Sequence, residues 1–148
     1  MGMFRSIDIS SSGLTAQRMR MDLIANNIAN VNSTRTQAGG AYRRQMPIFQ
    51  ARENRDFAYA LQNSTFGRNT AGGGVRVARI VEDPSPLLTV YDPNHPDADA
   101  NGYVQMPNVN IVNEMVDMIS ATRAYEANAT SVDSAKKMFS RALEIGRG

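Results

Sequence analysis

The sequence contains no cysteine, no tryptophan and a single histidine. Without cysteine, the chain has no disulfide, no thiolate nucleophile and no Cys-ligated zinc site. No apolar run approaches the ~20 residues of a membrane-spanning helix. The sequence also lacks a basic start followed by an uninterrupted apolar stretch, so we expect no cleaved secretory signal.

Features of strongly charged or catalytic proteins are missing too. A formal net charge of +2 over 148 residues is too small to indicate a nucleic-acid partner, and the arginines are scattered without stacking aromatics between them. His95 has no serine or cysteine nucleophile motif beside it. We therefore expect no catalytic residues, no metal site and no cofactor, and the sequence predicts a protein that is not an enzyme.

One segment, residues 97–104, begins like an EF-hand calcium loop, with Asp or Asn at alternate positions followed by Gly102. The twelfth position of that loop needs a bidentate Glu and holds Asn108 instead. Prolines precede the segment where the entering helix should be. A tight polar turn is favoured, and a small calcium-binding or peptide-binding module remains the alternative.

Apolar residues recur with a period of seven between about residues 3 and 31, as in a helix that offers a narrow stripe to partner helices. Ser10 and Gln17 interrupt this stripe, and three serines followed by Gly13 weaken the helix near its start. One row of the stripe contains Ile7, Leu14, Met21 and Ile28, and the adjacent row contains Ile24 and Val31.

A cluster of asparagines closes this first helical pattern. Asparagine is a mediocre helix former that bonds readily to nearby backbone, so the cluster indicates a helix end. A sharper hypothesis is that Asn26 and Asn27 also hydrogen-bond to a neighbouring helix and fix its register.

The C-terminal pattern is stronger, because residues 110–145 contain no proline or glycine. Asn110 fits an N-cap, Glu114 and Asp117 lie near the positive end of the helix dipole, and Gly146 can end the helix. Some 35 residues would form a rod about 53 Å long. The main row is Ile111, Met118, Tyr125, Val132 and Phe139, with Met115, Thr122, Ala129 and Leu143 beside it.

The middle of the chain is rich in Gly, Pro, Asn and Asp, and its apolar residues form only short runs. Residues 42–49, 75–81 and 87–91 are strand candidates, while residues 50–71 are polar and irregular. We predict a mainly α, α+β fold. Long N- and C-terminal helices pack as a coiled-coil-like pair around a small, irregular, β-rich middle, with regions 1–35, 36–107 and 108–148.

A long helix cannot bury its own stripe, and each large apolar side chain left in water forgoes about 1.5–3 kcal/mol. The N-terminal helix is shorter and patchier, so it covers only part of the C-terminal stripe. The remainder indicates neighbouring subunits. For the isolated chain we expect incomplete order at residues 1–30 and beyond about residue 120.

The two helical ends resemble a known family. The stretch SGLTAQRMRMDLIANNIANVNSTRT (residues 12–36) resembles the N-terminal signature of flagellar axial proteins, which include rod, hook and junction subunits. The stretch YVQMPNVNIVNEMVDMISATRAYEANATSV (residues 103–132) resembles their C-terminal signature. The short length, GGAYRRQ (residues 39–45) and YDPNHPDADANGYV (residues 91–104) are most similar to the basal-body rod branch, at its proximal end.

This resemblance implies a structural subunit of the flagellar rod, exported unfolded by the flagellar export apparatus without a cleaved signal. It implies that both terminal helices line an inner tube, in a rod that spans the periplasm. The implied partners are copies of the chain itself and neighbours of the FlgB, FlgF, FlgG and FliE types, with no nucleic acid and no membrane insertion. The implied subunit-packing residues are Leu14, Met21, Ile24, Asn26, Asn27, Ile28, Val31, Ile111, Met115, Met118, Tyr125, Val132, Phe139 and Leu143.

Overall fold

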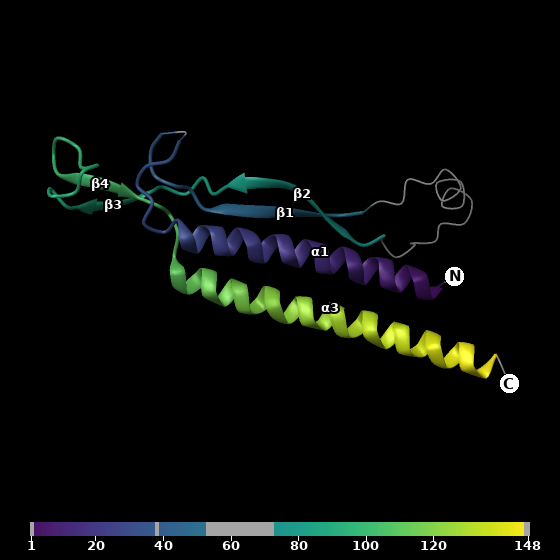
Figure 1. Cartoon of the computed structure of the whole chain (residues 1–148). Coiled ribbons are helices and arrows are strands. Elements are labelled where there is room, and N and C mark those ends of the chain that lie inside the picture. Colours follow the sequence, from purple (N-terminus) through teal and green to yellow (C-terminus); the bar gives the residue numbers. More distant parts are fainter. Residues whose placement is uncertain (1, 38, 53–72, 147–148) are drawn as a thin grey trace, which may run out of the picture.

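The computed structural model describes residues 2–37, 39–52 and 73–146 (Figure 1). It confirms a mainly α, α+β fold with a long helix at each end and small antiparallel sheets between them. Most of segment 50–71, predicted to be polar and irregular, lies outside the described residues. The elements in order are α1 (Gly2–Ala29), β1 (Gln45–Ala51), β2 (Val75–Glu82), β3 (Leu88–Tyr91), β4 (Tyr103–Met106) and α3 (Ile111–Ile145).

Helices α1 and α3 lie side by side and run in opposite directions, so both termini are at the same end of an elongated molecule (Figure 1). Their pairing is visible along the length of α1. Phe4 stacks edge-on against Phe139, with ring centroids 5.8 Å apart. At the opposite end, Asn27 donates a hydrogen bond to Glu114.

On the α3 side, the seam between the two helices consists of small and polar side chains. The buried residues of α3 are Glu114, Ala121 and Ala135, which fall on one heptad row. Gly13 of α1 lies so close to α3 that a Cβ there would be 3.1 Å from the side chain of Asn128, on the same row. Small residues let the helix axes approach, because a large side chain would hold them apart.

The predicted row of large residues is therefore not the centre of the helix–helix seam. Met118, Tyr125 and Val132 lie beside the seam and are half-buried. Ile111 and Phe139, at the two ends of the row, are exposed. A search for large apolar residues at heptad spacing finds the row beside the seam. It does not find the seam row itself, because alanine is small and glutamate is charged.

The predicted ends of the helices are close to the observed ones. Asn110 is the N-cap of α3, and its side chain accepts hydrogen bonds from the backbone N–H groups of Val112 and Asn113. Gly146 is the C-cap. The weak serine-rich start of α1 is helical, and Ser12 there accepts a hydrogen bond from the Val75 N–H, at 3.0 Å, where β2 begins.

The middle region contains two separate antiparallel hairpins. Strands β1 and β2 pair in register Gln45↔Glu82 to Ala51↔Val75, and this hairpin runs beside α1 (Figure 1). The observed β1 begins and ends later than the predicted strand 42–49. Strands β3 and β4 form the second hairpin, beyond the end of the helical pair (Figure 1).

Strand β4 was not predicted, because residues 103–106 were interpreted as part of a polar turn. They pair with the whole of β3, from Tyr91↔Tyr103 to Leu88↔Met106. Gly102, with φ +79°, ends the connection between these strands.

The chain exposes 10962 Å² of surface in all, against about 7,500 Å² for a compact protein of its mass. The molecule is therefore extended.

Candidate functional site

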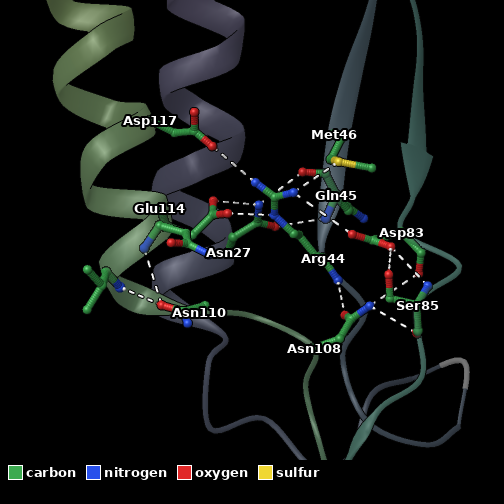
Figure 2. Close-up of polar contacts among 12 residues, drawn as sticks. Asn27, Arg44, Gln45, Met46, Asp83, Ser85, Asn108, Asn110, Glu114 and Asp117 are labelled. Atoms are coloured by element: carbon green, nitrogen blue, oxygen red, sulfur yellow. Dashed lines mark hydrogen bonds and ion pairs between the residues drawn. The ribbon is translucent and has the colours of Figure 1, made fainter.

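The most buried polar side chain of α1 is that of Asn27, which is 1% exposed and lies where both helices meet the start of β1. Its amide nitrogen donates to the Gln45 carbonyl and to Glu114 Oε2, each at 3.0 Å. Its oxygen accepts from the Tyr42 hydroxyl and from the Gln45 N–H, each at 2.9 Å. Asn27 thus uses its full hydrogen-bonding capacity to join α1, α3 and β1 (Figure 2).

Glu114, on the first turn of α3, is 0% exposed and is paired on both carboxylate oxygens. Its Oε1 accepts from Arg44 Nε at 2.6 Å, and its Oε2 accepts from Asn27. Arg44 also donates to Asp117 at 3.2 Å (Figure 2). Asp117 in addition accepts from Arg20 of α1 at 2.9 Å. We call Asn27, Tyr42, Arg44, Glu114 and Asp117 the polar junction. Every buried charge within it has an opposite partner, as burial requires.

Asn108 connects this junction to the second hairpin. Its side-chain oxygen accepts from the Arg44 N–H at 2.8 Å, and its nitrogen donates to the carbonyls of Asp83 and Ser85 (Figure 2). The segments that enter and leave β3–β4 are therefore held next to β1. The position predicted to fail as a calcium ligand has a structural role instead.

Two groups near the junction have shifted pKa values. Burial raises the pKa of Tyr42, and the negative charges of Glu114 and Glu82 add to the increase. The phenol thus stays protonated and donates to Asn27. Hydrogen bonds from the Ser85 side chain and backbone lower the pKa of Asp83, and Arg44 and Arg43 favour the charged form further.

The two asparagines proposed to fix helix register differ in their surroundings. Asn27 reaches α3 through Glu114, as that hypothesis requires. Asn26 is exposed, and its side-chain oxygen accepts only from Asn30, one turn away on the same helix. Asn27 thus has the cross-helix contact that the register hypothesis requires, and Asn26 has only the local contact expected near a helix end.

A second feature is an apolar strip on the opposite side of α3 from the seam. Val112 and Glu114, like Ile119 and Ala121, are two residues apart, which places them about 200° apart around the helix. The strip therefore faces away from α1. We call this the outer stripe; it consists of Val112, Met115, Val116 and Ile119, which are 68%, 55%, 62% and 54% exposed.

The structure divides the predicted packing residues into three groups. Ile24 and Asn27 are buried. The half-buried ones are Leu14, Met21, Ile28, Val31, Met118, Tyr125 and Val132. The exposed ones are Asn26, Ile111, Met115, Phe139 and Leu143. Within the chain, Met21 meets Thr122, whose hydroxyl lies 3.6 Å from the methionine sulfur, and Phe139 meets Phe4.

Sequence reasoning missed the most important members of both features. Glu114 was assigned to the helix dipole, although its heptad relation to Ala121 and Ala135 marks the seam. Arg44 was counted among scattered arginines, and no local signal distinguishes it. Val112, Val116 and Ile119 were overlooked, although their spacing with Met115 is that of one helical face.

The acidic turn between β3 and β4 uses its oxygens within the chain. Asp97 accepts from the Thr34 hydroxyl at 2.7 Å, and Asp99 accepts from the N–H groups of Asn101 and Tyr103. Strands flank the turn where an EF-hand has helices. His95 accepts from the Asp97 N–H within the same turn. In the described ranges, no group of three or more His, Asp or Glu residues is placed to hold a metal ion.

The described helices include none that is long and apolar enough to cross a membrane.

Comparison with known proteins matches both ends of the chain to one group of families. Residues 7–35 match the family "Flagella basal body rod protein", and residues 100–145 match "Flagellar basal body rod FlgEFG protein C-terminal". These segments contain most of α1 and all of α3.

Full-length relatives extend this match to the middle of the chain. The flagellar basal-body rod protein FlgC of Borreliella burgdorferi is 55% identical over 152 aligned residues, covering 100% of both chains. FlgC of Bacillus subtilis is 47% identical, covering 97% of this chain and 98% of its own. FlgC of Aquifex aeolicus is 40% identical and covers 97% of each. The chain therefore belongs to the FlgC family of flagellar basal-body rod proteins.

Proposed function

We propose that the chain is a structural, non-enzymatic subunit of the basal-body rod, at its proximal end, and that the exposed faces of its terminal helices bind neighbouring subunits. Regions 1–35 and 108–148 form the inner tube, and region 36–107 lies outside it. The neighbours are further copies of the chain and subunits of the FlgB, FlgF, FlgG and FliE types. The subunit reaches the periplasm-spanning rod through the flagellar export apparatus, without a cleaved signal.

The observation that carries this proposal is the outer stripe. Four large apolar side chains on one helical face are more than half exposed, while the opposite face of the same helix is buried. About 60% of their surface is still in water, and burying it would contribute about 4–7 kcal/mol per subunit. Helix faces with anchors at i, i+3, i+4 and i+7 are typical of surfaces that bind another helix.

Exposed apolar residues at the far end of α3 extend the same argument. Met138, Leu143 and Ile145 are exposed, and Phe139 is covered only in part by Phe4. Both ends of α3 thus present apolar side chains that α1 does not cover. A tube of helices from neighbouring subunits would cover them, since each copy meets copies on more than one side.

A charge on the outer stripe tests the proposal. Val116→Glu should leave the isolated chain within about 0.5 kcal/mol of the native stability, because Val116 is already in water. It should nevertheless abolish rods and motility, since assembly would bury an unpaired carboxylate. Thr130→Glu, at an exposed position of α3 beyond the stripe, is the matched control and should remain motile.

Secretion, basal-body morphology and swimming should be measured together. The expected result for Val116→Glu is secreted protein without assembled rods. Native swimming by Val116→Glu cells would show that the outer stripe does not face a neighbour. A loss of secretion in both variants would instead assign the effect to export.

A further inference from the structure

The buried apolar residues that we assign to the seam between α1 and α3 follow heptad rows. On α3, Ala121 and Ala135 are fourteen residues apart on one heptad row, and on α1, Ala16 and Leu23 are seven apart. After a slide of α3 along α1 by one heptad, about 10.5 Å, α1 would still face only small or polar members of the same α3 row, and no large apolar side chain of that row would mark the native position. Apolar packing therefore distinguishes poorly between the native register and its heptad neighbours.

The polar contacts of the seam do not repeat in this way. Asn27 meets a carboxylate only when Glu114 is opposite, and the next residue on that heptad row is an alanine. Gly13 leaves space for Asn128, and a slide by one heptad would move Asn128 toward Arg20, where no glycine leaves that space. A slide by seven would leave the amide of Asn27 facing a methyl group.

The cost of a wrong register would fall mainly on Asn27 and Glu114. Both are nearly inaccessible to water, so neither could replace its lost partner with solvent. A buried polar group left unpaired is costly, whereas a satisfied one adds little net stability. Such groups therefore select one arrangement more than they stabilise it, as a buried asparagine does in coiled coils.

We propose that Asn27, Glu114 and Asn128 are positioning residues that select a single register of α3 against α1. The register decides where the outer stripe lies relative to β1–β2, because this hairpin is bonded to α1 through Gln45 and Ser12. A shifted subunit would be folded and helical, yet its faces would not match those of its neighbours. The inference concerns contacts within one chain and does not depend on the rod function.

The absence of cysteine makes the register measurable with introduced thiol pairs in the full-length protein. Met21→Cys with Thr122→Cys reports the native register, because these side chains touch. Met21→Cys with Ala129→Cys reports a slide of one heptad, because Ala129 is seven residues further along α3. A short thiol-specific cross-linker separates the two, since the positions differ by about 10.5 Å along the helix.

Each reporter pair should be combined with Glu114→Ala plus Asn128→Ala, which makes the seam row of α3 alanine throughout. The native cross-link should then fall and the shifted cross-link should appear, while far-ultraviolet circular dichroism still shows a helical protein. The control, Glu126→Ala plus Thr130→Ala, removes two exposed side chains of the same helix and should give only the native cross-link. Only the native cross-link in both backgrounds would overturn the proposal.

If Glu114→Ala plus Asn128→Ala unfolds the protein, a second variant tests whether the polar contacts select the register. Glu114→Ala with Ala121→Glu moves the carboxylate by one heptad and keeps the composition unchanged. The proposal expects the register to follow the carboxylate, so that the cross-link moves from the Thr122→Cys pair to the Ala129→Cys pair. If the shifted cross-link does not form in this variant, the polar contacts do not select the register.

Discussion

Replacing Asn27 by alanine should destabilise the isolated chain far more than the same replacement of its neighbour Asn26. The two residues have the same chemistry and the same helical environment, but opposite burial. Asn27 makes four hydrogen bonds, two of them to the backbone of Gln45. The side chain of Asn26 accepts one exposed bond from Asn30. Comparing the two variants therefore separates the stability lost with tertiary contacts from the change due to helix propensity.

The magnitude follows from the partners that lose their bonds. Four hydrogen bonds at about 0.5–1.5 kcal/mol each give about 2–6 kcal/mol. The backbone groups of Gln45 would be left without this partner, which disfavours the low end of that range. Alanine regains about 0.5 kcal/mol of helix propensity at either position. We expect a loss of about 3–5 kcal/mol for Asn27→Ala and a change within about 0.5 kcal/mol for Asn26→Ala.

Urea unfolding of the purified chain, followed by circular dichroism, measures both variants. With a slope of about 2 kcal/mol/M, the midpoint for Asn27→Ala should fall by about 1.5–2.5 M. Asn27→Asp adds a check, because it keeps the shape but puts a carboxylate beside Glu114 and the Gln45 carbonyl. This variant should be less stable than the native chain at neutral pH, and its stability should recover in acid as the new carboxylate is protonated. Equal midpoints for Asn26→Ala and Asn27→Ala would refute the account of the polar junction.

Three further outcomes follow from the junction and the ends. Folding raises the pKa of Tyr42, so the contribution of its phenol to the free energy of unfolding is complete below the ordinary tyrosine pKa of about 10 and is lost as the pH rises further. When the free energy of unfolding is measured against pH, Tyr42→Phe should lack this loss of stability at alkaline pH. Folding lowers the pKa of Asp83, so Asp83→Asn should destabilise the chain at neutral pH, and this difference should vanish as acid protonates the native carboxyl. The polar junction narrows the expectation of incomplete order from residues 1–30 and beyond about 120 to the frayed ends. Hydrogen exchange on the isolated chain should be slowest near Asn27 and fastest in residues 2–10 and 136–145, and uniform native protection along both helices would contradict this.

The long elements of the fold could be predicted from the sequence because their signals are local. The N-cap at Asn110, the unbroken run to Ile145 and the glycine that follows are all decided within a few residues. Both terminal helices were accordingly placed within two residues of their observed ends. Strand β4 was missed because a short strand depends on its partner, and its four residues directly follow the polar turn that ends at Gly102.

The junction could not be predicted because its members are brought together only by tertiary structure. Arg44 and Glu114 are seventy residues apart in sequence, and neither lies in a motif that indicates the other. The buried row of α3 was not singled out from the sequence for a different reason. Heptad analysis weights large apolar residues, and the buried positions are alanines and a paired carboxylate, so Ala121 was passed over in favour of Met118.

The chemical difference between the two faces of α3 also determines which face meets α1. If the outer stripe packed on α1 instead, Val112 and Ile119 would contribute more apolar area than the alanines of the native seam. Asn27 would then face aliphatic side chains, and it would lose the hydrogen bond to Glu114. The carboxylate of Glu114 would meanwhile sit on the outer surface, where an apolar neighbour would have to bury it. Asn27 on α1 thus disfavours packing of the outer stripe against α1, and the apolar side chains of the stripe stay exposed in the isolated subunit.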